Sequence, residues 1–447
     1  MSNTIKSNHN GLTIDGSSKP ISEMETAGQL TQSRFVDFLE YVLMFLVILE
    51  FNTAYMEFGF FVTFLFYGTI FLTFLLLLFR KGAIKIGPLL VFYYLGSFLP
   101  LMNVYPGTEK RFIKLFWIII PLFMLYFSSL RRVSLDRIIS FLIKYSNIVV
   151  ILALISLVYW VFGTNLEMIQ PTLYVPNSWR GDGVRLIPTY HFIYFETQQS
   201  SFMGYETVRN SGIFNEGPMY NMVLCVALAM ELFLRTRKSV WRIIVLIITI
   251  FTTFTTTGFL FLGVAIAWVV FVFFSQKARV FIVAALPLLI IGMMNFSNAI
   301  VEDKEDSSSG ASSVDARTTD ILTCIDIGLA NPVLGQGLFT KKATESEGGT
   351  YGFSNSLFTI FADGGLYTVF LYFAALVLIP LRYFSRKHMI FWPLLMFSFF
   401  VIFAFTTSQF KVLTLLFVAF GLIMFRELSY NNHRHSYKCH TFNKQSL

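Results

Sequence analysis

Apolar residues in this chain are grouped into long runs, and polar segments separate one run from the next. The runs contain about 17–25 residues, the length that a helix needs to cross roughly 30 Å of hydrocarbon. We therefore predict an all-α integral membrane protein with about twelve transmembrane helices. The predicted spans are residues 35–51, 58–79, 86–102, 112–127, 141–162, 218–234, 241–256, 258–274, 279–296, 356–379, 389–406 and 410–425.

Two long polar stretches interrupt this series of spans, and polar tails flank it. The first 33 residues lack the basic-then-apolar order of a cleaved signal peptide, so we expect a disordered cytoplasmic tail before an uncleaved anchor helix. The expected order is a tail (1–33), five helices (34–162), a first long loop (163–217), four helices (218–296), a second long loop (297–355), three helices (356–426) and a basic tail (427–447).

The apolar stretch 241–274 is too long for a single crossing. It contains the run Thr255-Thr256-Thr257-Gly258, in which glycine relaxes the backbone and threonine hydroxyls can satisfy carbonyls released from the helix. We predict a hairpin break at this point.

Lysine and arginine gather in alternate short loops, and these loops fall on one side when twelve spans are threaded. Only one short loop on the other side is basic, with Lys110 and Arg111. The positive-inside rule predicts that both termini are cytoplasmic and that both long loops lie outside. The net charge of +8 is explained by this bias, so it does not indicate nucleic-acid binding. The basic clusters are Arg80/Lys81/Lys85, Arg131/Arg132/Arg137, Arg235/Arg237/Lys238/Arg242, Lys277/Arg279 and Arg382/Arg386/Lys387.

The composition excludes an ordinary soluble domain. Hydrophobic residues make up 55% of the chain and charged residues 13%, where a soluble protein carries roughly a quarter. The three cysteines, Cys225, Cys324 and Cys439, do not share a compartment and depth in this topology, so no disulfide framework is expected. The sequence contains no CxxC or HExxH spacing, and we expect neither a metal nor another cofactor.

The second long loop is acidic, with nine acids against four bases, so its few basic residues call for a reason. Ser312 and Asp315 form a plausible helix cap, and apolar residues from Val314 recur at helical spacing until Asn331-Pro332. We predict a short amphipathic helix on the outer membrane surface with Arg317 in its first turn.

Three patches together resemble the O-antigen polymerase and ligase group, the Wzy-type membrane enzymes. The first, Arg209-Asn210-Ser211-Gly212-Ile213-Phe214-Asn215-Glu216-Gly217-Pro218, is similar to the R-x-x-G-x-F-x-E-x-P element of the group. The second is the Thr-rich, Gly-ended turn at 253–258. The third runs from Arg317 through Asn331-Pro332-x-x-Gly335-x-Gly337 and Ser354-Asn355-Ser356-Leu357 to Asp363-Gly364-Gly365, with Ser354 where many relatives have histidine.

The resemblance implies a glycosyltransferase of a bacterial plasma (inner) membrane that builds an O-antigen, capsule or exopolysaccharide. Its substrates would be oligosaccharides on a polyprenyl diphosphate such as undecaprenyl diphosphate, and its partners a flippase and a chain-length regulator. A departing diphosphate requires fixed positive charge, which arginine supplies through its bidentate fork. We expect Arg209 and Arg317 to bind the diphosphate, with Arg180 and Arg185 as secondary candidates. For each of them the alternative is a solvated or headgroup-facing arginine.

Three residues are candidates for acid–base roles in the reaction. Glu216 begins a predicted helix, so it is either a base or a first-turn carboxylate favoured by the helix dipole. His191 is the one histidine predicted outside, and it is catalytic or incidental. Asp363 lies within a predicted span, where function and a structural ion pair with Lys411 or an arginine are both open.

Two roles are open for Asn355, which lies at a predicted helix start: it binds substrate, or it caps the helix. Aromatic residues of the first loop stack on sugars or anchor the loop at the interface.

A flippase or secondary transporter is the alternative from another class, since twelve helices are common there. Transporters place polar groups near mid-membrane, whereas polar residues here concentrate in the outer loops. A ligase that moves the glycan to another acceptor shares the motifs. The sequence therefore favours a polymerase and leaves the ligase open.

Overall fold

The computed structural model describes residues 21–50, 53–79, 122, 125–126, 129, 135–177, 184–202, 205–235, 237–255, 257–259, 261–263, 265, 319, 321–337, 358–367 and 369–370. This part of the chain is mostly helical. Two helices in it are long and apolar enough to cross a membrane, Gly59–Leu78 and Ile139–Asn165. Their presence agrees with a membrane protein, and the number of twelve spans remains a prediction.

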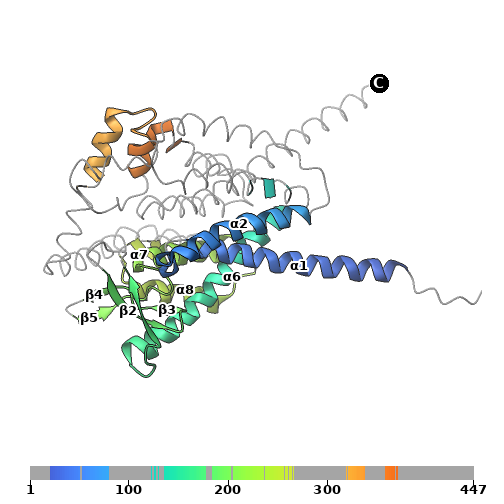
Figure 1. Cartoon of the computed structure of the whole chain (residues 1–447), viewed down its shortest axis with the longest axis horizontal. Helices are drawn as coiled ribbons and strands as arrows, with labels where there is room; N and C mark the ends of the chain where they lie inside the picture. Colours follow the sequence, from blue (N-terminus) through green and yellow to red (C-terminus); the bar gives the residue numbers. More distant parts are fainter. Residues whose placement is uncertain are drawn as a thin grey trace, which may run out of the picture.

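The N-terminal half of the described part contains three long helices. α1 (Ile21–Leu49) begins inside the predicted tail, α2 (Gly59–Leu78) coincides with the predicted span 58–79, and a 3-10 turn, η1 (Ala54–Glu57), joins them. α6 (Leu135–Tyr159) continues as a π-helical turn, η3 (Trp160–Asn165), beyond the predicted end at 162. Figure 1 shows α1 and α2 side by side, and α1 also packs against α6.

The next helices are shorter. α7 (Gly217–Ala229) and the π-helical turn η4 (Met230–Leu234) together match the predicted span 218–234. α8 (Val240–Thr252) packs against both α6 and α7. α7 is buried on all sides from Met219 to Ala229, which makes it the central helix of this bundle. The predicted spans 86–102, 279–296, 389–406 and 410–425 lie outside the described residues.

The prediction of an all-α protein is wrong for the first long loop, which contains five short strands. β1 (Leu173–Asn177), β2 (Arg185–Tyr190) and β3 (Tyr194–Phe195) form one antiparallel sheet in that order. β4 (Gln199–Phe202) pairs with β5 (Tyr205–Val208) in a second hairpin. Val175 pairs with Ile187, and both are buried against Ala54 and Phe195. Burial of this pair against the α1–α2 turn selects strands where the local sequence gives only a weak alternation.

The strands lie at one end of the helix bundle, and the charged side chains of Glu231, Arg235 and Arg242 lie at the other. At one end Trp160 donates from Nε1 to the carbonyl of Val208 in β5, and α7 begins beside the strands (Figure 1). Glu231 lies fourteen residues after Gly217 along α7 and η4, which is about 21 Å at 1.5 Å per residue. It pairs with Arg235 and Arg242 at that far end. These basic residues therefore lie opposite the first long loop, as the sequence predicts; the membrane side of each end remains a prediction.

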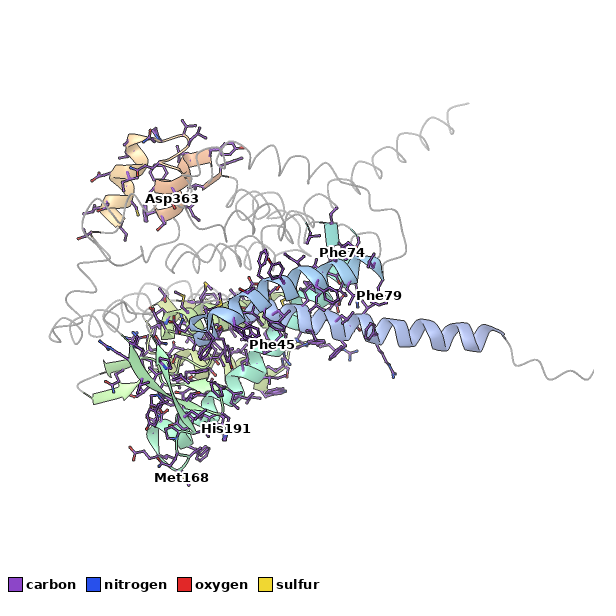
Figure 2. The ribbon with its side chains drawn as sticks, in the orientation of Figure 1. Phe45, Phe74, Phe79, Met168, His191 and Asp363 are labelled. Carbon is purple, nitrogen blue, oxygen red and sulfur yellow. The ribbon has the colours of Figure 1, made fainter. Side chains whose placement is uncertain are left out.

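α2 carries a row of exposed aromatic residues along one face. Phe60, Phe64, Tyr67, Phe71 and Phe74 recur at intervals of three or four residues and are each more than half exposed. An apolar face of this kind is suited to lipid contact, because hydrocarbon requires no polar partner. Figure 2 shows Phe74 and Phe79 toward the end of this helix.

Candidate functional site

Arg209 and Asn210 follow β5 directly and lead the chain toward α7. The backbone N–H of Arg209 donates to the carbonyl of Gln198 at 3.0 Å, and that of Asn210 donates to the carbonyl of Thr252 at 2.9 Å. Only 8% of Arg209 is exposed, and Asn210 is fully buried. The first motif is therefore fixed by its main chain at the strand end of the bundle.

The stem of the Arg209 side chain crosses Gly217, the first residue of α7. A Cβ placed on Gly217 would lie 3.3 Å from Cδ of Arg209 and 3.1 Å from the carbonyl oxygen of Thr253. The backbone N–H of Gly217 also donates to Oε1 of Gln198 at 3.3 Å. The missing side chain lets an arginine stem, a helix start and the Thr-rich turn meet at one point.

Asn210 connects two helices, α6 and α8, at this point. Its amide Nδ2 donates to Oγ of Ser156 at 3.3 Å and to Oγ1 of Thr252 at 3.0 Å, and its Oδ1 accepts the N–H of Gly212 at 3.2 Å. Gly212 has φ +56°, and a Cβ there would approach the ring of Tyr220 to 3.0 Å. Asn and Gly are thus required in this motif by hydrogen bonding and by a left-handed turn.

The Thr-rich turn breaks the helix where the sequence predicts a break. α8 ends at Thr252, Phe254 has φ +46°, and helical backbone resumes at residue 257. Thr253 donates from its hydroxyl to the carbonyl of Ile250 at 2.7 Å, which satisfies one carbonyl released from the helix. A Cβ on Gly258 would lie 2.4 Å from Oδ1 of Asn221, so glycine is required for the return of the chain along α7.

Glu216 occupies the N-cap position of α7 and is half-buried. Its side chain makes no capping hydrogen bond to the helix, and Pro218 follows within the first turn. The carboxylate is therefore not engaged as a helix cap, although it still lies at the positive end of the α7 dipole. This position leaves the predicted role as a base open to test.

The other catalytic candidates lie elsewhere. His191 is exposed in the turn between β2 and β3 with φ +50°, and its ring centre is 6.4 Å from that of Tyr159. Figure 2 shows His191 and Asp363 at opposite ends of the described part, so the structure does not bring them into one site. Arg185 is exposed at the start of β2, opposite Asn177. Arg180, Arg317 and Asn355 lie outside the described residues.

The described part of the third motif, residues 331–337 and 363–365, forms a compact backbone unit around Asp363. A helix (Ile321–Ala330) is present where the sequence predicts an amphipathic one, and it ends before Asn331-Pro332. The N–H of Gln336 then donates to the carbonyl of Ala362, and the N–H of Gly337 to that of Asp363, both at 3.0 Å. A Cβ on Gly335 would lie 2.4 Å from the carbonyl carbon of Asp363. The two glycine-rich elements therefore pack backbone against backbone, which no larger residue permits.

Glu196, which the sequence did not single out, lies in a network of hydroxyl groups beside the strands. It accepts hydrogen bonds at 2.7 Å from the phenol of Tyr190 and from the hydroxyl of Thr164. Burial and the adjacent carboxylate raise the pKa of Tyr190. No local motif marks this carboxylate, because Thr164 lies 32 residues away in η3 and the fold brings it to Glu196 beside Tyr190. Among the described residues, no group of three or more His, Cys, Asp or Glu side chains is placed to hold a metal ion.

Residues 241–373 match the family model described as O-antigen ligase. Comparison with curated proteins found no match, and comparison with solved structures found none either. The matched stretch contains the Thr-rich turn and the Asp363 unit, and the Arg209 motif precedes it in sequence but packs onto its start. Over residues 241–373 the chain is therefore similar to the O-antigen ligase family, in agreement with the polymerase and ligase group indicated by its motifs.

Proposed function

We propose that this protein joins polyprenyl-diphosphate-linked oligosaccharide units into a surface polysaccharide, as a polymerase at the outer face of a bacterial plasma membrane. The match to the O-antigen ligase family supports a role in polysaccharide assembly or ligation. The observation that carries the proposal is the position of Arg209, buried at the start of α7 and packed across Gly217.

The proposed reaction exchanges one bond for another. The hydroxyl of the acceptor sugar attacks the anomeric carbon of the donor, and the bond from that carbon to the diphosphate oxygen breaks. The hydroxyl proton passes to a base, and the polyprenyl diphosphate departs with the bonding electron pair. Arg209 would stabilise the negative charge on that oxygen, assisted by Arg317, and Glu216 would accept the proton.

The surroundings of Arg209 suit this role. A guanidinium remains charged even when its surroundings exclude water, and its fork pairs with two phosphate oxygens at once. Exclusion of water around the buried Arg209 strengthens that attraction, and the N-terminal dipole of α7 adds to it. The hydrogen bond from Asn210 to Thr252 holds the backbone beside Arg209, so little reorganisation is needed when charge develops.

A ligase is the second candidate, because the matched family carries that description. A ligase would break the same donor bond and pass the glycan to an acceptor other than a second lipid-linked unit. The flippase alternative has no support from the comparisons.

The test uses the purified full chain in detergent with lipid-linked oligosaccharide units. The rate of glycan transfer should fall roughly 10²–10³-fold in the Arg209→Ala and Arg317→Ala variants if each arginine stabilises the departing anion. Glu216→Gln tests the base, and Arg34→Ala is a matched control because Arg34 is exposed on α1. Products of increasing length identify a polymerase. Transfer only to a different added acceptor identifies a ligase, and full activity in both arginine variants would remove the assigned roles.

A further inference from the structure

The end of the bundle opposite the strands carries two clusters of charged side chains. The first, which we call the Glu40 cluster, consists of Asp37, Glu40, Arg137 and Lys144. Arg137 lies 2.8 Å from Asp37 and 3.0 Å from Glu40, and Lys144 also pairs with both carboxylates. Two acids meet two bases, so this cluster is balanced and requires no additional ion.

The second, which we call the Glu231 cluster, consists of Glu231, Arg235, Lys238 and Arg242. Glu231 is fully buried, and both arginines lie 2.8 Å from its carboxylate. Among the described residues, this cluster contains one carboxylate and three cationic side chains, and Arg237 is exposed in the same loop. The Glu231 cluster therefore differs from the Glu40 cluster in carrying excess positive charge.

The two arginines are held next to each other by a shared acceptor. Oδ1 of Asn147 accepts Nη2 of Arg235 at 2.5 Å and Nη2 of Arg242 at 2.7 Å. Two guanidinium groups on one oxygen repel each other, and the buried carboxylate of Glu231 offsets part of this repulsion. The arrangement presents two fixed cationic forks with part of their hydrogen-bonding capacity directed to Glu231.

Lys238, in the loop between η4 and α8, adds a third positive charge. Its Nζ donates to the carbonyl of Glu231 at 3.3 Å and to that of Leu232. Desolvation lowers the pKa of Lys238, Glu231 opposes this shift and Arg235 adds to it, so that the pKa is about 8. An anion placed beside this loop would reduce the repulsion among the three cations.

The start of α8 exposes apolar side chains next to this charge. Val240 and Trp241 are 69% and 53% exposed, and the guanidinium of Arg242 lies over the Trp241 ring at 5.7 Å from its centroid. Exposed indole rings are typical of membrane–water interfaces, where cations meet lipid phosphates. The exposed apolar residues therefore lie next to the cationic side chains, as a site for a lipid phosphate would require.

We propose that the loop between α7 and α8 binds the phosphate of an anionic phospholipid, with Arg235, Lys238 and Arg242 as its ligands and Trp241 as its interfacial anchor. The site is separate from Arg209, which lies at the other end of α7. It would fix α7 and α8 relative to the bilayer, independently of the glycan that the protein handles.

The test is native mass spectrometry of the detergent-solubilised full chain with added phosphatidylglycerol, phosphatidylcholine or inorganic phosphate. The unaltered protein should retain phosphatidylglycerol at least tenfold more tightly than phosphatidylcholine. Lys238→Gln and the Arg237→Gln/Lys238→Gln pair should reduce this preference severalfold, whereas Arg34→Gln should leave it unchanged. These variants avoid Arg235 and Arg242, whose loss would strand the buried Glu231.

Equal retention of the two lipids, or an unchanged preference in both Lys238 variants, would overturn the proposal. Inorganic phosphate that displaces phosphatidylglycerol at equal concentration would also overturn it, since a free anion would then be the ligand. Because the readout is lipid retention, the result does not depend on whether the protein polymerises glycans.

Discussion

Asn210 is joined to Thr252 twice, by its backbone N–H at 2.9 Å and by its side-chain amide at 3.0 Å. Thr252 is the last residue of α8 and lies within the stretch similar to O-antigen ligases, whereas Asn210 precedes that stretch by about thirty residues. The pair therefore combines two motifs separated in sequence into one candidate site and positions Arg209 beside the start of α7.

Replacing Asn210 with alanine should lower both stability and activity. The substitution removes the bonds to Ser156 and Thr252 and leaves their buried hydroxyls with fewer partners, a cost of about 1–3 kcal/mol. Thermal unfolding in detergent and a chain-extension assay measure the two effects. Asn165→Ala is the control, since Asn165 is exposed and bonds only locally to Trp160. Equal melting temperatures for the two variants would contradict the proposed role of Asn210.

Alanine at Gly335 or Gly365 should disrupt the unit around Asp363. Both glycines have positive φ, at +67° and +62°, and a Cβ would lie within 2.4 Å of the backbone of Asp363 or Val333. The left-handed conformation alone costs a larger residue of order 1–3 kcal/mol, before the steric clash is counted. We expect reduced yield of folded protein by size-exclusion chromatography. Gly59→Ala, with no atom within 4 Å of its Cβ, should behave as the unaltered protein.

Breaking the Glu40 cluster should destabilise the packing of α1 on α6. In the Glu40→Leu variant, Asp37 is the one carboxylate of the cluster that remains for Arg137 and Lys144. Lys144 is 4% exposed, so solvent cannot replace the lost carboxylate. Loss of one partner from a buried pair costs about 3–5 kcal/mol. The double variant Glu40→Leu/Lys144→Leu should recover part of the melting temperature, because it removes one cation with the anion. Glu167→Leu is the exposed control, and a double variant no better than Glu40→Leu would exclude the electrostatic explanation.

Binding of anionic lipid should depend on pH through Lys238. Its pKa in the fold is about 8, against 10.5 for an ordinary lysine, because burial and Arg235 outweigh Glu231. The charged form binds phosphate, so affinity should be full at pH 7 and fall as pH rises through 8. Folding stability has the opposite sign: the unfolded chain keeps this proton up to 10.5, so stability should rise between pH 8 and 10.5.

Lipid retention measured from pH 6.5 to 9.5 tests this dependence. Lys238→Arg should remove the loss of affinity in that range, because arginine keeps its charge throughout. A loss of affinity that persists unchanged in the arginine variant would assign the titration to another group.

Several local features were predictable because the chemical requirement is local. The helices at 59–78 and 217–234 follow from apolar runs of membrane-spanning length, which leave only hydrogen bonding within the helix for the backbone. The break after Thr252 follows from a Thr-rich, Gly-ended run. The strands at 173–208 were missed because each is short, and its burial depends on Ala54 and Phe195 rather than on its own pattern.

The candidate site likewise combines features that the sequence predicted with features that it did not. The resemblance of residues 209–218 to a motif of the polymerase and ligase group, together with the permanent, bidentate charge of arginine, identified Arg209 as a diphosphate ligand candidate. Sequence could not indicate that Gly217 lets its stem pass, that Asn210 connects it to Thr252, or that His191 and Asp363 lie far apart. The sequence by itself determined which segments are apolar enough for lipid and which residues carry usable charge. The tertiary structure alone decided which of them meet, because contacts between distant residues depend on helix packing that no local pattern encodes.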